Sequence, residues 1–149
     1  MKRPVTFAAL ILVAASFSAF AHMGATGIVK QRMETMKEMK SAMAEIGAMV
    51  KKERPFDASV VAKAGKSLAR DASRISGQFP NTKESRQKVS EATERVWEEM
   101  PRFKALAVDL EKKAKALSKA DSAASMKVSF MEVGKACSAC HEDFRRKRN

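Results

Sequence analysis

The amino-acid sequence predicts an all-α fold, an antiparallel four-helix bundle. Apolar residues recur at three- and four-residue steps in four separate segments, which is the spacing of one face of a helix. No segment alternates apolar and polar residues as a half-buried strand does. Short turns join the segments, apart from one longer crossover between the second and the third. Amphipathic helices of similar length that are connected in this way form a bundle around a single core.

Residues 1–21 have the pattern of a secretory signal peptide. Two basic residues are followed by an apolar run and by a small-residue cleavage motif that ends at Ala21. A membrane anchor is the alternative, but the apolar run is short for crossing a bilayer and ends in a cleavable motif. We therefore expect an exported protein without a stable membrane anchor. Its single domain would be residues 22–149, which is 149 − 21 = 128 residues.

The composition is strongly basic. Lys and Arg number 29 against 17 Asp and Glu, a formal net charge of +12, and removal of Lys2 and Arg3 with the signal peptide leaves +10. Such a charge attracts nucleic acid, anionic lipid or acidic proteins. The chain has no nucleic-acid-binding motif, and an exported protein rarely meets DNA. We therefore prefer acidic partner proteins, although any single lysine is equally well explained as part of a solvated surface.

The first helix is expected over residues 26–52. Arg32 falls within its apolar seam, where an unpaired charge is costly, so this side chain should extend to solvent or meet an anionic partner. Pro55 disfavours helical geometry in the residue before it and ends the segment. The apolar positions of the seam follow the a/d spacing of a packed bundle; they are Val29, Met36, Met39, Met43, Ile46 and Val50.

The second helix is expected to begin after Asp57, whose carboxylate suits the N-cap position, and to continue to Pro80. Its apolar stripe comprises Val61, Ala64, Leu68, Ala72, Ile75 and Phe79. Residues 81–96 are polar and charged, and they predict a mostly irregular crossover with one short helix.

Pro101 suits the first turn of the third helix. The stripe of this helix comprises Phe103, Leu106, Ala107, Leu110, Ala114 and Leu117. Residues 118–121, Ser-Lys-Ala-Asp, resemble a capping-box turn before the fourth helix.

The fourth helix, expected over residues 122–147, carries the most specific motif of the chain, Cys137-Ser-Ala-Cys140-His141. C-x-x-C-H is the attachment site of a c-type haem. The two thiols add to the haem vinyl groups, and the adjacent imidazole is the proximal ligand of the iron. The motif shares a helix face with apolar residues, so one covalently bound haem c is expected to point into the bundle. This face comprises Met126, Phe130, Val133, Cys137, His141 and Phe144.

A redox dithiol, a structural disulfide and half a zinc site are the other interpretations of the cysteine pair. A zinc site needs further ligands, whereas the chain has only these two cysteines and one other histidine, His22. A thioredoxin-like dithiol is expected at a βα junction, but the flanking sequence predicts one continuous helix. A bare disulfide is therefore the main alternative to haem attachment.

The chain resembles the class II c-type cytochromes, the cytochrome c′ and cytochrome c-556 family, over residues 26–147. The ending CSACHEDFRRK is similar to the family pattern C-x-x-C-H-x-x-F/Y-R-x-K, and KQRMETMKEM near the start is similar to K-x-R-x-x-x-L/M-x-x-M. Pro55-Phe56-Asp57 and Trp97 also lie where family members have related residues. The crossover departs from the family, because a Gly-rich segment is usual before the tryptophan and residues 81–95 contain no glycine.

The resemblance implies roles for particular residues. Cys137 and Cys140 would carry haem c, and His141 would supply the proximal ligand. Arg32 would lie near a haem propionate, and Arg145 would lie on the proximal side. Export fits the haem, because bacteria attach haem c on the far side of the inner membrane, so we expect a periplasmic protein that exchanges electrons with redox partner proteins.

Met36 distinguishes two functions, because the resemblance places this position over the distal face of the iron. A methionine there, as in cytochrome c-556, is a sixth ligand that suits single-electron transfer. An apolar non-ligand, as in cytochrome c′, leaves five-coordinate iron that binds NO or CO. Methionines on a helix are also common core residues, an ambiguity that Met36 shares with Met33, Met39 and Met43.

We prefer an electron carrier with no enzymatic activity. A five-coordinate binder of NO or CO is the second hypothesis, and a haem-free helical interaction protein is the third. Dimers through the first two helices are common in the family, although no residue here selects between a monomer and a homodimer. The basic tail, residues 145–148, complements a helix dipole or forms a docking patch for an acidic partner, and the two roles are not exclusive.

Overall fold

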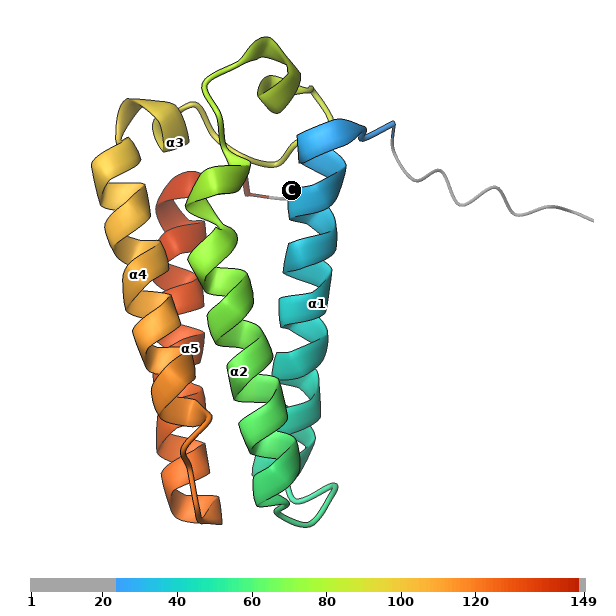
Figure 1. Ribbon diagram of the computed structural model, residues 1–149, viewed down its shortest axis with the longest axis vertical. Coiled ribbons are helices and arrows are strands. Elements are labelled where there is room, and N and C mark those ends of the chain that lie inside the picture. Colours follow the sequence, from blue (N-terminus) through green and yellow to red (C-terminus); the bar gives the residue numbers. More distant parts are fainter. Residues whose placement is uncertain (1–23, 148–149) are drawn as a thin grey trace, which may run out of the picture.

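The computed structural model describes residues 24–147, which form a bundle of four long helices (Figure 1). These are α1 (Gly27–Val50), α2 (Ala58–Arg74), α4 (Met100–Leu117) and α5 (Ala123–Phe144). The prediction of an all-α bundle is confirmed. No helix in residues 24–147 combines the length and the apolar character needed to cross a membrane. The predicted signal peptide lies outside the described residues.

The bundle has two distinct ends, which we name by their connections. At the hairpin end, short turns join α1 to α2 and α4 to α5 (Figure 1). At the crossover end, residues 75–99 lead from α2 to α4 and lie beside the start of α1 and the end of α5 (Figure 1). The crossover contains two 3-10 turns, Ser76–Gln78 and Lys83–Arg86, and the short helix α3 (Arg95–Glu98). The expected irregular segment is thus present, with more short helical turns than the one we predicted.

Both hairpin turns are fixed by capping side chains. Asp57 is the N-cap of α2, as predicted, and its carboxylate accepts hydrogen bonds from the backbone of Ser59 (2.8 Å) and Val60 (3.2 Å). The hydroxyl of Ser59 also donates to this carboxylate, and these hydrogen bonds lower the pKa of Asp57. The capping box of α5 consists of Ser122 and Ser125, not of residues 118–121 as predicted. The prediction failed because the turn before α5 contains several Ser and Asp residues, any of which suits the N-cap position. The sequence alone does not show which of them is the N-cap.

The end of α5 differs from the prediction. The helix stops at Phe144, not at residue 147, and Arg145 has an extended backbone that forms an isolated antiparallel bridge with Ala92. Thr93 N donates to the Phe144 carbonyl (3.0 Å), and Arg146 N donates to the Glu91 carbonyl (2.7 Å). The last residues therefore pair with the crossover, which takes the place of another helical turn.

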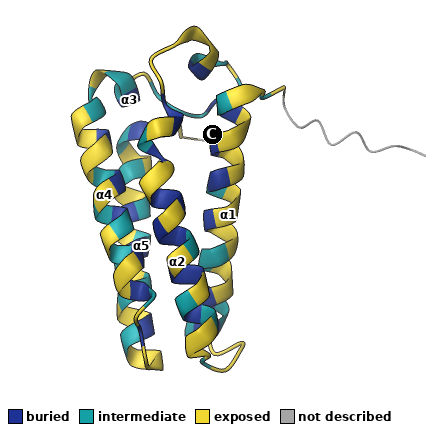
Figure 2. Cartoon of the chain, in the orientation of Figure 1, coloured by how far each residue is buried: buried dark blue, intermediate teal, exposed yellow. Residues whose placement is uncertain are grey.

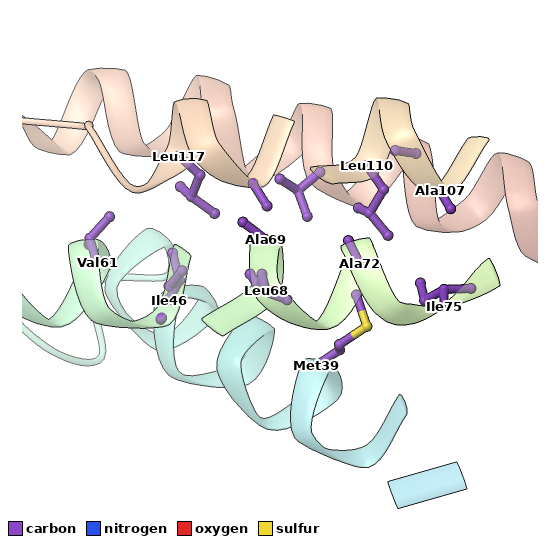
Figure 3. Packing of buried hydrophobic residues seen from close by; sticks show 14 of the residues in the cluster. Met39, Ile46, Val61, Leu68, Ala69, Ala72, Ile75, Ala107, Leu110 and Leu117 are labelled. Atoms are coloured by element: carbon purple, nitrogen blue, oxygen red, sulfur yellow. The ribbon is translucent and has the colours of Figure 1, made fainter. Parts of the chain in front are cut away.

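The core runs along the bundle axis (Figure 2). Towards the hairpin end, Ile46, Val61 and Leu117 point toward one another from three helices (Figure 3), and all three are fully buried. A Cβ atom at Gly65 of α2 would lie 2.6 Å from the backbone nitrogen of Ser118, so glycine permits the close approach at that point. This end is closed by apolar contact.

The buried face of α1 is rotated slightly from the predicted seam. Val29, Met39 and Ile46 are buried as expected, whereas Met36 and Met43 are only partly buried. The predicted seam repeats every seven residues, but a straight helix with 3.6 residues per turn drifts by about 20° over each repeat. The buried face therefore also takes in Thr35, Gly47 and Met49.

Candidate haem-binding site

The C-x-x-C-H motif occupies the last turns of α5, at the crossover end. Cys137 and Cys140 are half-buried free thiols that pack against the apolar core. His141 is exposed and lines a surface hollow. The other lining residues are Ser138, Glu142, Arg145, Arg146 and Lys147. Arg145, expected on the proximal side of a haem, thus lies in the same hollow as His141.

The local environment sets the protonation of the motif. Burial raises the pKa of the Cys137 thiol and raises that of Cys140 to about 11, with further contributions from Cys137 and Asp143. Both groups are therefore protonated thiols at neutral pH, a state that resists oxidation. Partial desolvation and the positive charge of Arg145 lower the pKa of His141. This favours the neutral imidazole, the form that binds a metal.

A contact between α1 and α5 fixes the register of these two helices. A Cβ atom at Gly47 would lie 3.5 Å from the Phe130 ring. The helices are antiparallel, so residues 11 positions away from this contact, Met36 and His141, lie at the same level. Eleven residues correspond to about 16 Å of rise and to three turns plus about 20°. From this spacing we expect Met36 and His141 to lie on about the same sides of their helices as Gly47 and Phe130 do.

The other methionines of α1 are less well placed. Met33 is 40% exposed, and Met39 is 6% exposed and points toward α2 (Figure 3). Met43 is half-buried like Met36, but it lies two helical turns closer to the hairpin end. Register and exposure together favour Met36 as the residue opposite His141.

Arg32 is 4% exposed and lies one turn from Met36. We expected solvent or an anion around its guanidinium, but the structure surrounds it with neutral oxygens of the crossover. It donates to the carbonyl of Ser85 (2.7 Å) and to the hydroxyls of Ser85 (3.0 Å) and Ser90 (2.6 Å), with a longer bond to the Gln78 carbonyl (3.4 Å). Its guanidinium carbon lies 4.5 Å from the centre of the Phe79 ring. Burial lowers the pKa of Arg32, as expected for a desolvated cation.

Sequence reasoning did not identify the crossover residues that bind Arg32. Ser85 and Ser90 are buried hydroxyls in a segment whose composition suggested exposure. The only signal was Arg32 itself, because a cation in an apolar seam requires partners. Nothing in the local sequence indicates which residues supply them.

The described residues fit a haem c better than a bare metal ion. Within residues 24–147, no three His, Cys, Asp or Glu side chains are grouped so that they could hold a metal ion, which gives no support to a zinc site. Two thiols one turn apart, followed directly by an imidazole, are the attachment and ligand set of a covalent haem. A four-helix bundle with this motif in its last helix defines a class II c-type cytochrome.

The family profile described as Cytochrome C' matches residues 27–145, and the chain belongs to this family. A cytochrome c' of Rhodopseudomonas palustris is 30% identical over 148 residues, covering 99% of this chain and 98% of its own. A cytochrome c-556 of Agrobacterium fabrum is 31% identical over 126 residues, covering 83% and 84% respectively. A solved structure of cytochrome c' from Rhodopseudomonas palustris superposes with a TM-score of 0.78 at 31% identity, covering 83% of this chain and 99% of the other.

Membership of this family implies a haem c, and proteins of this kind are generally electron carriers. The similar proteins carry both names, cytochrome c' and cytochrome c-556. The family therefore does not decide how the iron is ligated. That question depends on the residues of the site.

Proposed function

We propose that this protein is an exported, periplasmic cytochrome that transfers single electrons through one haem c. Cys137 and Cys140 bind the haem covalently, His141 is the proximal ligand of the iron and Met36 is the sixth ligand. The haem supplies a one-electron iron couple, and the chain holds it, orients it and restricts access to it. The protein performs no substrate chemistry.

The register of α1 and α5 carries this proposal. The helical spacing from the contact of Gly47 with Phe130 supports a position of Met36 level with His141, from which a thioether would reach an iron held by His141. A thioether is a soft ligand that favours ferrous iron and raises the reduction potential. A sixth ligand that is kept in both oxidation states minimises rearrangement during electron transfer and excludes small gases.

Two arginines flank the axial residues in this proposal. Arg145 lies beside His141 in the surface hollow and favours the neutral imidazole. The expected position of Arg32 near a propionate stays a prediction. In this structure its guanidinium links α1 to the crossover.

The basic surface supports acidic redox proteins as partners. Arg146 and Lys147 are exposed beside His141, close to where electrons would enter or leave. Complementary charge raises association rates and is weakened by salt. The rate of electron exchange with an acidic redox protein should therefore fall as ionic strength rises.

Absorption spectra of the purified holoprotein test the ligation. We expect sharp ferrous α and β bands that carbon monoxide leaves unchanged. Met36→Ala should produce a broad high-spin spectrum that shifts with carbon monoxide. Met43→Ala is the matched control, because it shortens a half-buried methionine of the same helix, and it should keep the low-spin bands.

A five-coordinate binder of NO or CO is the second candidate, because a cytochrome c' is among the similar proteins. A wild-type ferrous spectrum that is already broad and shifts with carbon monoxide would establish this candidate. It would also exclude Met36 as a ligand. Loss of the haem on acid-acetone extraction would contradict covalent attachment altogether.

A further inference from the structure

The crossover touches both helices that carry the axial residues. On one side it binds the start of α1. The Thr26 N–H donates to the Gln87 side-chain oxygen (3.2 Å), and the Gln87 amide donates back to the Thr26 carbonyl (3.2 Å). Arg32 adds its bonds to Ser85 and Ser90. The first two turns of α1 are therefore attached to residues 85–90.

On its other side, the crossover binds the end of α5. Arg145 is paired with the carboxylate of Glu91, with its Nε atom 2.7 Å and a terminal nitrogen 2.6 Å from the same oxygen. Backbone hydrogen bonds join Thr93 to Phe144 (3.0 Å) and Arg146 to Glu91 (2.7 Å). The guanidinium of Arg146 also donates to the carbonyl of Lys88 (3.0 Å).

The two sets of contacts meet at Ser90, which is 6% exposed. Its hydroxyl oxygen accepts from the Arg32 guanidinium (2.6 Å) and from the Ala92 N–H (3.1 Å). Its carbonyl oxygen accepts from the Arg146 guanidinium. One residue therefore connects α1 to the segment that follows α5, through two cationic donors. Hydrogen bonds from charged donors are stronger than neutral ones.

These contacts lie where the spacing of α1 and α5 matters most. Towards the hairpin end, the two helices touch directly through Gly47 and Phe130. At the level of Met36 and His141, a haem has to fit between them, so direct side-chain packing cannot hold them together. A polar connection across the end of the bundle can set the spacing while it leaves room for the cofactor.

We propose that residues 85–93 form a clasp that holds α1 against α5 at the distance at which Met36 reaches the iron, with Ser90 as its central positioning residue. This inference rests on the proposed function, because it takes Met36 as the sixth ligand. Opening the clasp lets α1 move away from α5 and exposes the sixth coordination position to small ligands.

The expected effect follows from a population shift. Carbon monoxide binds only the fraction of molecules in which Met36 has left the iron, so its apparent affinity scales with that fraction. Ser90→Ala removes the hydroxyl acceptor of Arg32. We expect the apparent affinity of the ferrous holoprotein for carbon monoxide to rise about tenfold, which corresponds to about 1.4 kcal/mol. Met36→Ala should raise it further.

Three further variants separate positioning from general destabilisation. Arg146→Ala opens the clasp from an exposed position, so it does not endanger folding, and it should raise the affinity in the same direction. Ser90→Thr keeps a hydroxyl and should restore wild-type behaviour. Ser122→Ala removes a serine hydrogen bond at the hairpin end and should leave carbon monoxide binding unchanged.

Amide hydrogen exchange provides a second readout that does not depend on the iron ligand. Exchange in residues 27–36 of α1 should be faster in Ser90→Ala and Arg146→Ala than in Ser122→Ala. Unchanged exchange in both clasp variants would overturn the clasp, whatever ligand the iron has. Faster exchange with unchanged carbon monoxide binding would overturn its role in positioning Met36.

The same variants distinguish failure of the clasp proposal from failure of the proposed function. If Met36→Ala opens the iron and both clasp variants do not, the electron carrier stands and the clasp is wrong. If the wild-type protein already binds carbon monoxide as tightly as Met36→Ala does, the ligation is wrong, and the positioning role of the clasp is wrong with it.

Discussion

At the hairpin end, Ile46, Val61 and Leu117 meet in a fully apolar cluster, and Gly65 brings α2 close to Ser118. At the crossover end, a chain of buried polar residues joins α1 to the crossover, namely Arg32, Thr35, Gln78, Ser85 and Ser90. The apolar end gains free energy from burial, which has little directional preference. The polar end gains less, because its hydrogen bonds replace bonds to water and the Gln78 side-chain oxygen has no partner, but its hydrogen bonds are directional. We infer that one end provides stability and the other provides geometry.

The largest effect on stability is expected at the apolar end. Leu117→Ala removes a fully buried side chain and should lower the free energy of unfolding by about 2–5 kcal/mol, the cost of lost burial plus a cavity. Urea unfolding followed by circular dichroism measures this loss. The spectrum of the folded holoprotein should not change. A spectral change at denaturant concentrations where the protein is folded would contradict the division between the two ends.

Arg32→Met should lower the free energy of unfolding less than Leu117→Ala does, but it should change the haem spectrum more. It removes the donor that satisfies buried oxygens of Ser85 and Ser90, and an unsatisfied buried acceptor costs about 1–3 kcal/mol. Urea unfolding and ferrous spectra measure the two effects together. Arg32→Lys should restore little, because one ammonium cannot reproduce the planar fork of the guanidinium. Full rescue by lysine would show that only the charge matters.

Ser122→Ala should cost about 1 kcal/mol, the usual contribution of an N-cap side chain. Its hydroxyl accepts from the Ser125 N–H (3.2 Å) at the start of α5. Thermal unfolding should show a modestly lower midpoint with unchanged iron ligation. A loss of order at the crossover end in this variant would mean that the two ends of the bundle are coupled along α5.

The smallest effect concerns acid stability at the crossover end. Hydrogen bonds from Arg95 and Arg102 lower the pKa of Glu99 below its ordinary value of 4.5. This carboxylate therefore adds stability above pH 4.5, and the contribution disappears as the pH falls through its lower, folded-state pKa. In Glu99→Gln, the free energy of unfolding measured by urea titration should fall less steeply as the pH is lowered below 4.5. Glu132→Gln is the control: Lys135 alone holds the Glu132 carboxylate by a hydrogen bond, so this effect should be weaker.

The sequence was sufficient where the deciding interactions are local. The spacing of apolar residues predicted the four long helices, Asp57 predicted the start of α2, and Pro101 predicted the first turn of α4, which begins at Met100. The C-x-x-C-H motif predicted haem attachment because its chemistry is contained in five adjacent residues. In each case, the residues that predict the feature lie within a few positions of it in the sequence.

Prediction failed where distant segments compete with local preference. Arg145 continues a helical pattern, but it pairs with Ala92, 53 positions earlier, and α5 stops. Arg32 was expected to meet an anion or solvent, but it is satisfied by oxygens of the crossover, whose position depends on the whole fold.

The contacts at Ser90 also have a consequence for the order of events during folding. They join residues 58 and 56 positions apart, whereas each helical hairpin closes through a turn of a few residues. Closing long loops costs more entropy, so distant contacts tend to form late. We expect the two hairpins to assemble first and the crossover end last. The thiols of Cys137 and Cys140 would then stay reachable while most of the bundle is already in place, which gives a bulky, rigid cofactor time to enter before the end closes behind it.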